Sequence, residues 1–443
     1  MAQFTGNLKE DTSKRSVAET SRRLILALQH LIAMFGATVL VPILTGLDPS
    51  VALCAAGMGT LIFHLCTKGK VPVFLGSSFA FIAPIIAVGN MYDGDLRYAQ
   101  GGIIVAGLIY ILVSFIVQKI GVANIRKVLP AQVIGPMIMV IGINLLPTAL
   151  DMAGINLLID GADGAVLTVA IAAITLVTAL AVKFTTKGFI SQVSILIAVV
   201  VGYIISLVCG QVAVSEISNA SYLAIPNFTL PKFSWEAILI IAPIVIAVFM
   251  EHVGDITTNG QVVGKNFIEE PGLNRTLLGD GLATLVAGLI GGPANTTYGE
   301  NTGVLAMTKN YDPSILRITA VFAIALSFIG KFGAAIRTIP TAVMGGISII
   351  LFSMIALIGI KTMKNEKVKM DIANIILMVV ILFVGLAPNI LGLNIGIKIT
   401  EEVALSGLSL AAILGIVLNL VIQGLRNGKS STKNKSEKKE KIA

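Results

Sequence analysis

The sequence predicts an all-α polytopic membrane protein, and three observations support this fold class. Of the 443 residues, 55% are hydrophobic and only 13% are charged, whereas about a quarter of the residues of a soluble domain are charged. The mean hydropathy is +0.90. The apolar residues form long runs separated by short charged loops, and about 20 apolar residues are enough to cross a bilayer as a helix.

This length rule predicts 14 transmembrane segments. The first apolar run is too long for the hydrophobic part of a signal peptide and has no small-residue cleavage pattern, so it is counted as the first span. The predicted spans are 24–46, 50–67, 71–90, 99–118, 129–151, 164–182, 188–209, 234–257, 276–291, 294–308, 314–335, 340–360, 371–388 and 403–424.

The basic residues predict that both termini are cytoplasmic. With these spans, 27 of the 32 Lys and Arg residues fall on the side of the N-terminus, and cytoplasmic loops of membrane proteins carry this excess. The longest outer loop is then 210–233. The net charge of +8 comes largely from short loops and a basic tail at 425–443, which suits an anionic membrane surface, so no nucleic acid is expected as a partner.

Two pairs of similar segments predict an inverted repeat. Gly36 in span one and Gly254 in span eight are 218 residues apart, and Gly76 in span three and Gly299 in span ten are 223 residues apart. Both separations are about half of the chain. Because each half would hold seven spans, an odd number, the second half would start on the opposite side of the membrane, as in many transporters.

Spans three and ten are predicted to be broken. "VPVFLGSSFAF" and "GGPANTTYGENTG" each combine proline, glycine and β-branched residues, which is typical of a short extended piece followed by a half-helix. We expect the two pieces to pair as antiparallel strands inside the protein, because unpaired backbone cannot face lipid. The two half-helix N-termini would then offer N–H groups to a polar ligand. The alternative is an irregular helix packed closely through its glycines.

Ionisable residues within the apolar spans are candidate functional residues. Glu251 and Asp255 in span eight are four residues apart and share one helix face, and Glu300 lies in span ten. At least one of these carboxyls is expected to hold a proton, as proton coupling requires. His30 and Asp280 have a plain alternative role in bridging helices, and Ser77 and Ser78 in satisfying nearby backbone.

No enzyme activity, metal or cofactor is predicted. The three cysteines and three histidines are scattered without metal-ligand spacing, and no nucleophile stands beside a base.

At these residues the chain resembles the nucleobase–ascorbate transporter family, also called xanthine/uracil permeases, and within it the bacterial uracil-transporting members most. The similarity covers nearly the whole chain. It includes "LQHLIAMFGATVLVPILTG" with the Gln29–His30 pair, "VPVFLGSSFAFIAP", "EHVGD" and "PANTTYGENTGVLAMTK". The family signature in the last segment is matched by Glu300, Asn301, Gly303, Thr308 and Lys309.

The resemblance implies a core domain and a gate domain, each built from both halves, and homodimers in some members. Applied here, it gives a cytoplasmic tail at 1–23, core segments at 24–118 and 234–335, gate segments at 119–209 and 336–424, the external loop at 210–233 and the tail at 425–443. It implies that the substrate lies between spans three and ten and contacts Glu251, Glu300, Gly299, Phe79 and Tyr298, supported by His30, Ser78 and Asn301.

The expected function is secondary active import of uracil across the plasma (inner) membrane by proton symport and alternating access. The family pattern has a histidine where this chain has Asp255, so Glu251, Asp255 and Glu300 are the candidates for proton coupling. Proton and sodium coupling both occur in the family. The alternatives are a symporter of xanthine or another nucleobase, and an anion transporter of the same architecture, against which the acid at Glu300 argues.

Overall fold

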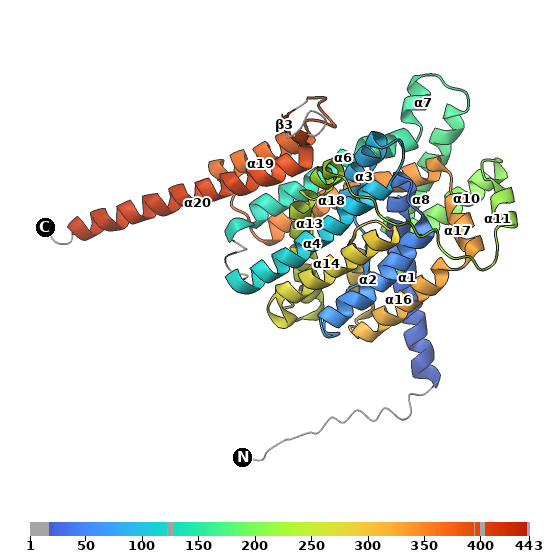
Figure 1. Cartoon of the computed structure of the whole chain (residues 1–443), viewed down its shortest axis with the longest axis horizontal. Helices are drawn as coiled ribbons and strands as arrows, with labels where there is room; N and C mark the ends of the chain where they lie inside the picture. The colour runs from blue at the N-terminus through green and yellow to red at the C-terminus, as the bar shows by residue number, and fades with distance from the viewer. Residues whose placement is uncertain (1–16, 122–123, 125–126, 394, 399–403, 441–443) are drawn as a thin grey trace, which may run out of the picture.

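The computed structural model describes residues 17–121, 124, 127–393, 395–398 and 404–440. Residues 1–16, which make up most of the predicted N-terminal tail, and residues 441–443 lie outside the described part. The chain is mostly helical (Figure 1), as predicted.

The first half of the chain combines long helices with a short strand and several helical turns. In chain order the elements are α1 (Val17–Thr45), α2 (Pro49–Cys66), β1 (Leu75–Ser77), η1 (Phe79–Phe81), α3 (Ile82–Met91), α4 (Arg97–Ile120), α6 (Ala131–Met152), α7 (Ile155–Ile159), α8 (Ala165–Thr185), α9 (Phe189–Gln192), α10 (Ser194–Val208) and α11 (Val214–Asn219).

The second half repeats this mixture of long helices and one broken segment. Its elements are α12 (Trp235–Ile241), α13 (Ile244–Val263), η2 (Ile268–Gly272), α14 (Leu273–Ile290), β2 (Asn295–Thr297), α15 (Gly299–Thr308), α16 (Pro313–Ser327), α17 (Gly330–Arg337), α18 (Thr341–Asn365), α19 (Ile372–Leu386), β3 (Gly396–Lys398), β4 (Ala404–Ser406) and α20 (Gly407–Glu440).

Several helix starts follow directly from the sequence. Asp48 and Asp312 each precede a proline and accept a hydrogen bond from the backbone N–H two residues later, at 2.7 and 2.9 Å. Asp371 caps α19 through the N–H of Asn374 at 2.9 Å. A side-chain acceptor before a proline at the first helical position is a strong start signal, because it satisfies an otherwise free N–H group.

The helices pack in two sets. Figure 1 shows α4, α14, α2 and α16 as neighbours, and α1 packs on α16. In the second set, α6 and α8 pack on α18, α10 on α8, and α19 on both α6 and α20. Helix α13 contacts both sets, since it packs on α15 and α14 and also on α6 and α20.

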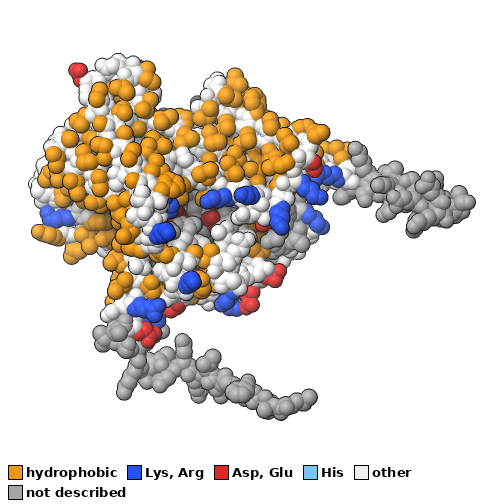
Figure 2. All heavy atoms as spheres, turned by 180° about the vertical axis from the view of Figure 1, so that it is seen from behind, with side chains coloured by type: hydrophobic (Ala, Val, Ile, Leu, Met, Phe, Trp, Pro, Cys, Tyr) orange, Lys and Arg blue, Asp and Glu red, His pale blue; other side chains and the backbone are white. Residues whose placement is uncertain are grey.

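Eight of the described helices are long and apolar enough to cross a membrane, so the predicted count of 14 spans is not established by helix length. Five of the other six predicted spans coincide with shorter or broken elements: β1 to α3, α9 and α10, β2 and α15, α16 and α17, and α19. The sixth is α14, which has 18 residues, as many as α2, but is not among the eight. Large apolar side chains are nevertheless exposed, such as Leu112, Phe184 and Val208 at 58%, 81% and 83%. Figure 2 shows apolar side chains as a broad band with Lys and Arg along one border, as expected of a multi-pass membrane protein.

Several boundaries differ from the prediction. Helix α1 starts at Val17, inside the predicted tail 1–23, and α13 continues to Val263, beyond the predicted end at 257. The predicted span 314–335 is two helices, because the outer loop pairs with the chain between them: Leu223 bridges Ile329. The predicted span 403–424 starts at Gly407 instead, since residues 404–406 form β4 and pair antiparallel with β3. The predicted tail 425–443 continues α20 as helix to Glu440.

Exposed ion pairs are consistent with the predicted alternation of sides. Each pair between described residues joins two groups that were predicted on the same side. On the predicted inner side they are Arg23–Asp312, Lys70–Glu270 and Arg426–Asp371, and on the outer side Arg97–Asp95, Lys232–Asp95 and Arg337–Asp48. Hydrogen bonds from Arg97 and then Lys232 hold the pKa of Asp95 well below its usual value.

The two predicted extended pieces pair as antiparallel strands. Leu75, Gly76 and Ser77 of β1 lie opposite Thr297, Thr296 and Asn295 of β2, and all six residues are buried. Two further bonds continue the ladder, Ser78 N–H to Ala294 O at 2.8 Å and Tyr298 N–H to Phe74 O at 3.0 Å. The backbone freed by each helix break is thus satisfied within the protein, as an apolar surrounding requires.

Gly76 is needed where it stands because the ring of Tyr298 lies against it. A Cβ at residue 76 would approach the Tyr298 ring to 2.4 Å. The Tyr298 hydroxyl donates to Ser77 O at 3.0 Å, so the ring is held in place and has little freedom to move away.

We predict that Gly76→Ala destabilises the folded protein by about 1–3 kcal/mol, the usual cost of overpacking a buried site. The measurement is thermal unfolding of the purified protein in detergent. Adding Tyr298→Ala to Gly76→Ala should recover part of the loss by removing the overlap. As a control, Gly424→Ala adds a Cβ where no atom lies within 4 Å. If Gly76→Ala unfolds at the temperature of Gly424→Ala, the proposed close contact is wrong.

Candidate functional site

Buried side chains from two neighbouring helices fix the strand pair. Thr60 of α2 accepts a hydrogen bond from Leu75 N–H at 2.9 Å, and Thr284 of α14 donates to Asn295 O at 2.9 Å. The Asn295 side chain donates to Ala55 O at 2.9 Å. Each strand is therefore held by a helix beside it, which gives the site a rigid base.

Two helical segments start from the strand pair. η1 and α3 follow β1, with Ser78 as the residue before the first turn, and α15 follows β2, with Tyr298 in that position. Neither start has a side-chain cap. The first N–H groups of a helix lack partners within the helix and carry the positive end of its dipole, so these two starts are suited to a ligand with carbonyl oxygens.

The predicted contact residues differ in exposure. Gly299 at the start of α15 is exposed, and no atom lies within 4 Å of the position of a Cβ there. Phe79 is 7% exposed and lines a cavity of about 230 Å³ between the two helix sets, with its ring edge-on to Phe352. Tyr298 is only 3% exposed and braces the strands.

The three predicted carboxylates lie near one another. Glu251 is within electrostatic range of Glu300 and Asp280, and Asp255 is within range of all three. The Thr297 hydroxyl, at the end of β2, donates to Asp255 Oδ2 at 2.8 Å. One oxygen of Glu251, Oε2, is buried without a hydrogen-bond partner among the described residues and is free to accept from a ligand.

The cavity beside Glu300 is small. Its volume is about 20 Å³, and it is bounded by α1 and by the chain from α9 to α10, including Gly36 and Ile195. That space holds about one water molecule, and a planar ring requires α1 and α10 to move apart. A larger cleft of about 390 Å³ lies along α13 but includes none of the three carboxylates.

Two of the three predicted supporting residues, His30 and Asn301, join one helix to another. The Asn301 amide donates to His30 Nδ1 at 3.2 Å and to His30 O at 3.1 Å, so Nδ1 accepts and α1 is joined to α15. This matches the helix-bridging alternative for His30. Ser77 donates to Thr38 O at 3.0 Å, whereas the Ser78 hydroxyl is buried without a partner among the described residues.

His252, next to Glu251, has one ring nitrogen, Nε2, whose protonation its neighbours fix. The Thr276 hydroxyl donates to Leu273 O at 3.0 Å, so its oxygen must accept from His252 Nε2, which lies 3.0 Å away. His252 Nδ1 and Asp280 Oδ2 are 3.2 Å apart and fully buried. They lack hydrogen-bond alignment, so the contact is electrostatic, and a proton on either group would make it attractive.

Two site residues carry no clear signal in the sequence. Asn259 donates to Pro72 O and to Thr302, each at 3.0 Å, and joins α13 to both broken segments. Lys183, at the end of α8, is a cation within electrostatic range of Glu300. The spacing of residues in the sequence identifies neither Asn259 nor Lys183, because their helices meet their partner segments only in the folded chain. The described residues contain no group of three or more His, Cys, Asp or Glu that could hold a metal.

Comparison with known proteins shows the family of the chain. Residues 21–393 match the family model for xanthine/uracil permeases, described as a permease family. The chain belongs to the xanthine/uracil permease family. It is 42% identical to the uracil permease of Bacillus caldolyticus, over 90% of this chain and 91% of that protein. It is 40% identical to the uracil permease of Escherichia coli strain K12, over 90% of each.

Solved structures show where else this permease fold occurs. The transmembrane domain of a cyanobacterial bicarbonate transporter, BicA, matches with a TM-score of 0.60 at 15% identity, over 92% of this chain and 98% of that one. The murine anion transporter Slc26a9, in its inward-facing state, matches with a TM-score of 0.67 at 11% identity, over 93% and 70%. At such identities the likeness concerns the fold alone.

We predict that Asp280→Asn keeps the stability of the permease to within about 1 kcal/mol, because an amide N–H can donate to His252 Nδ1 without a titrating proton. Asp280→Leu should cost about 1–3 kcal/mol, since it leaves the buried nitrogen unpaired. Thermal unfolding of both variants is the measurement. Equal losses for the two would contradict an attractive contact between His252 and Asp280.

Proposed function

We propose that this permease imports uracil by proton symport, with uracil bound between the starts of α3 and α15. The observation that carries the proposal is the β1–β2 pair, which fixes two uncapped helix starts at the two ends of one short ladder. Glu300 stands in the first turn of α15, and Glu251 is within electrostatic range of it. The identity of the substrate is supported by relatives that are named uracil permeases.

Uracil suits these groups because its ring alternates N–H donors and carbonyl acceptors. The Glu300 carboxylate accepts a ring N–H, and the backbone N–H groups at Gly299 and Phe79 donate to a ring carbonyl. Glu251, with its free Oε2, accepts a second N–H. Cytosine replaces a carbonyl with an amino group and would leave a buried donor unpaired, so the site rejects it. Phe79 covers one face of the ring, and Tyr298 holds the start of α15 in position.

Proton coupling is assigned to Asp255, with Glu251 and Glu300 as the other members of the group. Asp255 is one turn from Glu251 on α13, and Thr297 joins it to the substrate-bearing segment. A proton taken up with substrate and released inward couples import to the proton gradient. Since uracil is neutral, each transported proton also contributes about 2.3 kcal/mol per 100 mV of membrane potential.

Alternating access requires two bodies that move against each other. We assign α1–α4 and α12–α17 to a core that carries the substrate and α6–α10 and α18–α20 to a gate. The packing of the two helix sets supports this division. The antiparallel strands, each held by a threonine of a neighbouring helix, Thr60 and Thr284, support two inverted halves of seven spans. The 20 Å³ cavity beside Glu300 lies at the contact between core and gate, where opening would admit the ring.

The anion-transporting alternative is disfavoured by the site. The related folds include a bicarbonate and an anion transporter, but an anion would meet Glu300 and Glu251 next to the helix starts that would attract it. We place the protein in the plasma membrane with both termini in the cytoplasm, as the excess of basic residues on that side supports. A homodimer, as in some family members, is part of the proposal, and xanthine is the second candidate substrate.

We predict that Glu300→Gln lowers the affinity for uracil at least about tenfold and reduces uptake accordingly. An amide keeps the shape but loses the charge-assisted hydrogen bond, worth about 1.5–3 kcal/mol. The measurements are radiolabelled uracil uptake and binding by the purified protein, with its amount in the membrane checked. Glu270→Gln, an exposed residue paired with Lys70, is the matched control. Normal uptake kinetics in Glu300→Gln would remove Glu300 from the ring site.

We predict that Asp255→Asn separates binding from accumulation. The amide can still accept the Thr297 hydroxyl, so uracil binding should stay within about twofold, while concentrative uptake is lost and exchange of internal for external uracil is retained. Calorimetry, uptake and counterflow in proteoliposomes measure the three properties. Asp163→Asn, in an exposed turn before α8, is the control.

Uncoupler-sensitive accumulation by Asp255→Asn would move the coupling role to Glu251. Uptake by the wild-type protein that follows a sodium gradient and ignores an uncoupler would contradict proton symport itself.

A further inference from the structure

The lining of the 390 Å³ cleft includes none of the residues that we assign to substrate binding or proton coupling. The cleft lies on the predicted cytoplasmic side, between α13 and the ends of four helices of the second set. Its lining from α13 includes Gly254, Thr257, Thr258 and Gln261, and the opposite wall includes Pro130, Thr362, Asn365, Glu366, Lys367, Lys369 and Arg426. The volume is that of a typical small-molecule site.

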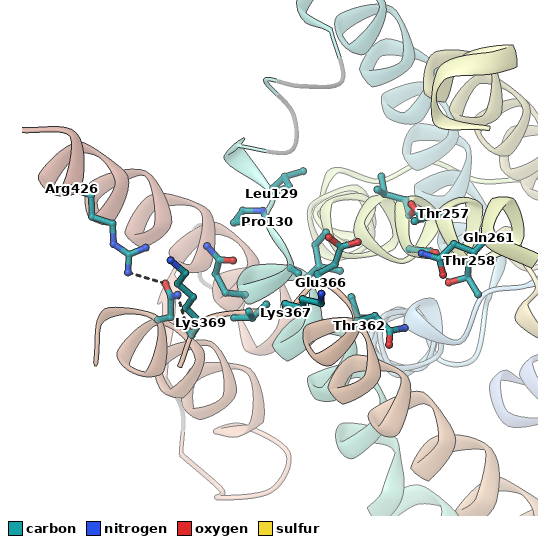
Figure 3. Close-up of a pocket in the computed structure, with 18 residues that line it drawn as sticks. Leu129, Pro130, Thr257, Thr258, Gln261, Thr362, Glu366, Lys367, Lys369 and Arg426 are labelled. Carbon is teal, nitrogen blue, oxygen red and sulfur yellow. Dashed lines mark hydrogen bonds between the residues drawn. The ribbon is translucent and has the colours of Figure 1, made fainter. Parts of the chain in front are cut away.

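The lining of the cleft has two chemically different ends. Figure 3 shows Thr257, Thr258 and Gln261 at one end, Lys369 and Arg426 at the other, and Glu366 with Lys367 between them. One end is therefore neutral and polar, and the other is cationic. A ligand that fits both ends has a neutral hydrogen-bonding group at one end and an anion at the other.

The neutral end presents acceptors and a free amide. The hydroxyls of Thr257 and Thr258 donate to Val253 O and Gly254 O at 2.7 and 2.9 Å, so their oxygens can only accept from a ligand. The Gln261 amide makes no hydrogen bond to another side chain in the described part of the protein, and it can donate to a carbonyl and accept an N–H. A pyrimidine ring with an N–H between two carbonyls matches this set.

The cationic end has unused charge. Arg426 is held by Asp371 at 2.6 Å and by Asn374 at 3.4 Å. In the described part of the chain, Lys367 and Lys369 have no carboxylate within ion-pair distance, although both are exposed at the rim. Arg and Lys are the usual ligands of phosphate groups. Glu366, between the two ends, is the residue type that accepts hydrogen bonds from ribose hydroxyls in nucleotide sites.

We propose that this cleft binds a pyrimidine nucleoside monophosphate from the cytoplasm and that the bound nucleotide inhibits import. The base lies against Thr258 and Gln261, the ribose against Glu366, and the phosphate against Lys369 and Arg426. The identity of the base rests on the proposed uracil transport: an imported free base is consumed by transfer of a ribosyl phosphate group to a ring nitrogen, which gives this class of molecule.

The inhibition follows from the position of the cleft. Its neutral end belongs to α13, in the proposed core, and its other residues to α6, α18, α19 and α20 or the turns beside them, in the proposed gate. A molecule that contacts both walls holds them at their present separation. It therefore opposes the movement of core against gate that each transport cycle requires, without touching Glu251 or Glu300.

A phospholipid head group shares the phosphate chemistry, but it lacks a ring with an N–H between two carbonyls. The set of acceptors and the amide at Thr257, Thr258 and Gln261 therefore favours the nucleotide. Inorganic phosphate would use the cationic end alone. The two ends can therefore be tested separately.

The test is direct binding to the full-length purified protein in nanodiscs of neutral lipid, by calorimetry and thermal shift. The probes are uridine monophosphate, uridine and inorganic phosphate. We expect uridine monophosphate to bind at least about tenfold more tightly than either of the others, because each of those lacks one end. Lys369→Ala and Gln261→Leu should each weaken its binding about tenfold, the loss of a hydrogen bond to a charged or buried group. Lys364→Ala, on the same basic segment but outside the cleft lining, should not.

The binding results separate the nucleotide from free phosphate and from lipid. Equal binding of phosphate and uridine monophosphate, or equal affinities of Lys369→Ala and Lys364→Ala, would overturn the proposal. If anionic lipid in the nanodisc displaces uridine monophosphate from the wild type and stabilises it more than Lys369→Ala, the cationic end serves lipid and the nucleotide proposal is wrong.

The effect of the nucleotide on transport is tested in a separate experiment. Uridine monophosphate inside proteoliposomes should slow uracil counterflow by the wild type at least about fivefold more than by Lys369→Ala, whose uptake without nucleotide should be unchanged. Uracil binding is measured in parallel. If the protein binds the nucleotide but not uracil, the proposed substrate is wrong and the proposed nucleotide site is still supported. Nucleotide binding that leaves counterflow unchanged would overturn the inhibitory role.

Discussion

The hydrogen-bonded pairing of β1 with β2 is the constraint on which the rest of the site depends. Two helices are interrupted deep inside the protein, and each interruption frees backbone groups that an apolar surrounding does not tolerate. The strands satisfy those groups against each other. Because η1 follows β1 and α15 follows β2, the same pairing fixes two helix starts at the two opposite ends of one short ladder. Their first N–H groups are the ones that we propose for a ligand. The same strand pair therefore meets the structural requirement and forms the proposed binding site.

The positions of the three carboxylates depend on that strand pair. Glu300 follows directly from β2, Thr297 at the end of β2 holds Asp255, and α13 adds Glu251 from the side. The groups that we propose for substrate binding and for proton coupling are therefore joined through a single short strand. His252 of α13 and Asp280 of α14 form a further contact that is fully buried, so this pair can help to orient α13.

Much of this could be predicted from the sequence, and the remainder depends on the folded chain. Composition and apolar runs predicted a membrane protein, and glycine with proline in spans three and ten predicted the broken segments and their pairing. Helix length did not establish 14 spans, since a break shortens a helix without removing its apolar character. Lys183 and Asn259 were missed because their partners lie on distant elements. The strand β4 was missed because residues 404–406 resemble the start of an apolar helix.

A structure of the protein with uracil bound, determined in a lipid nanodisc, would decide whether uracil binds between the starts of α3 and α15. We expect the ring within hydrogen-bond distance of the Glu300 carboxylate and of the backbone N–H groups at Gly299 and Phe79, with α1 and α10 further apart than they are here. Uracil found in the cleft along α13, or away from the strand pair, would contradict this placement.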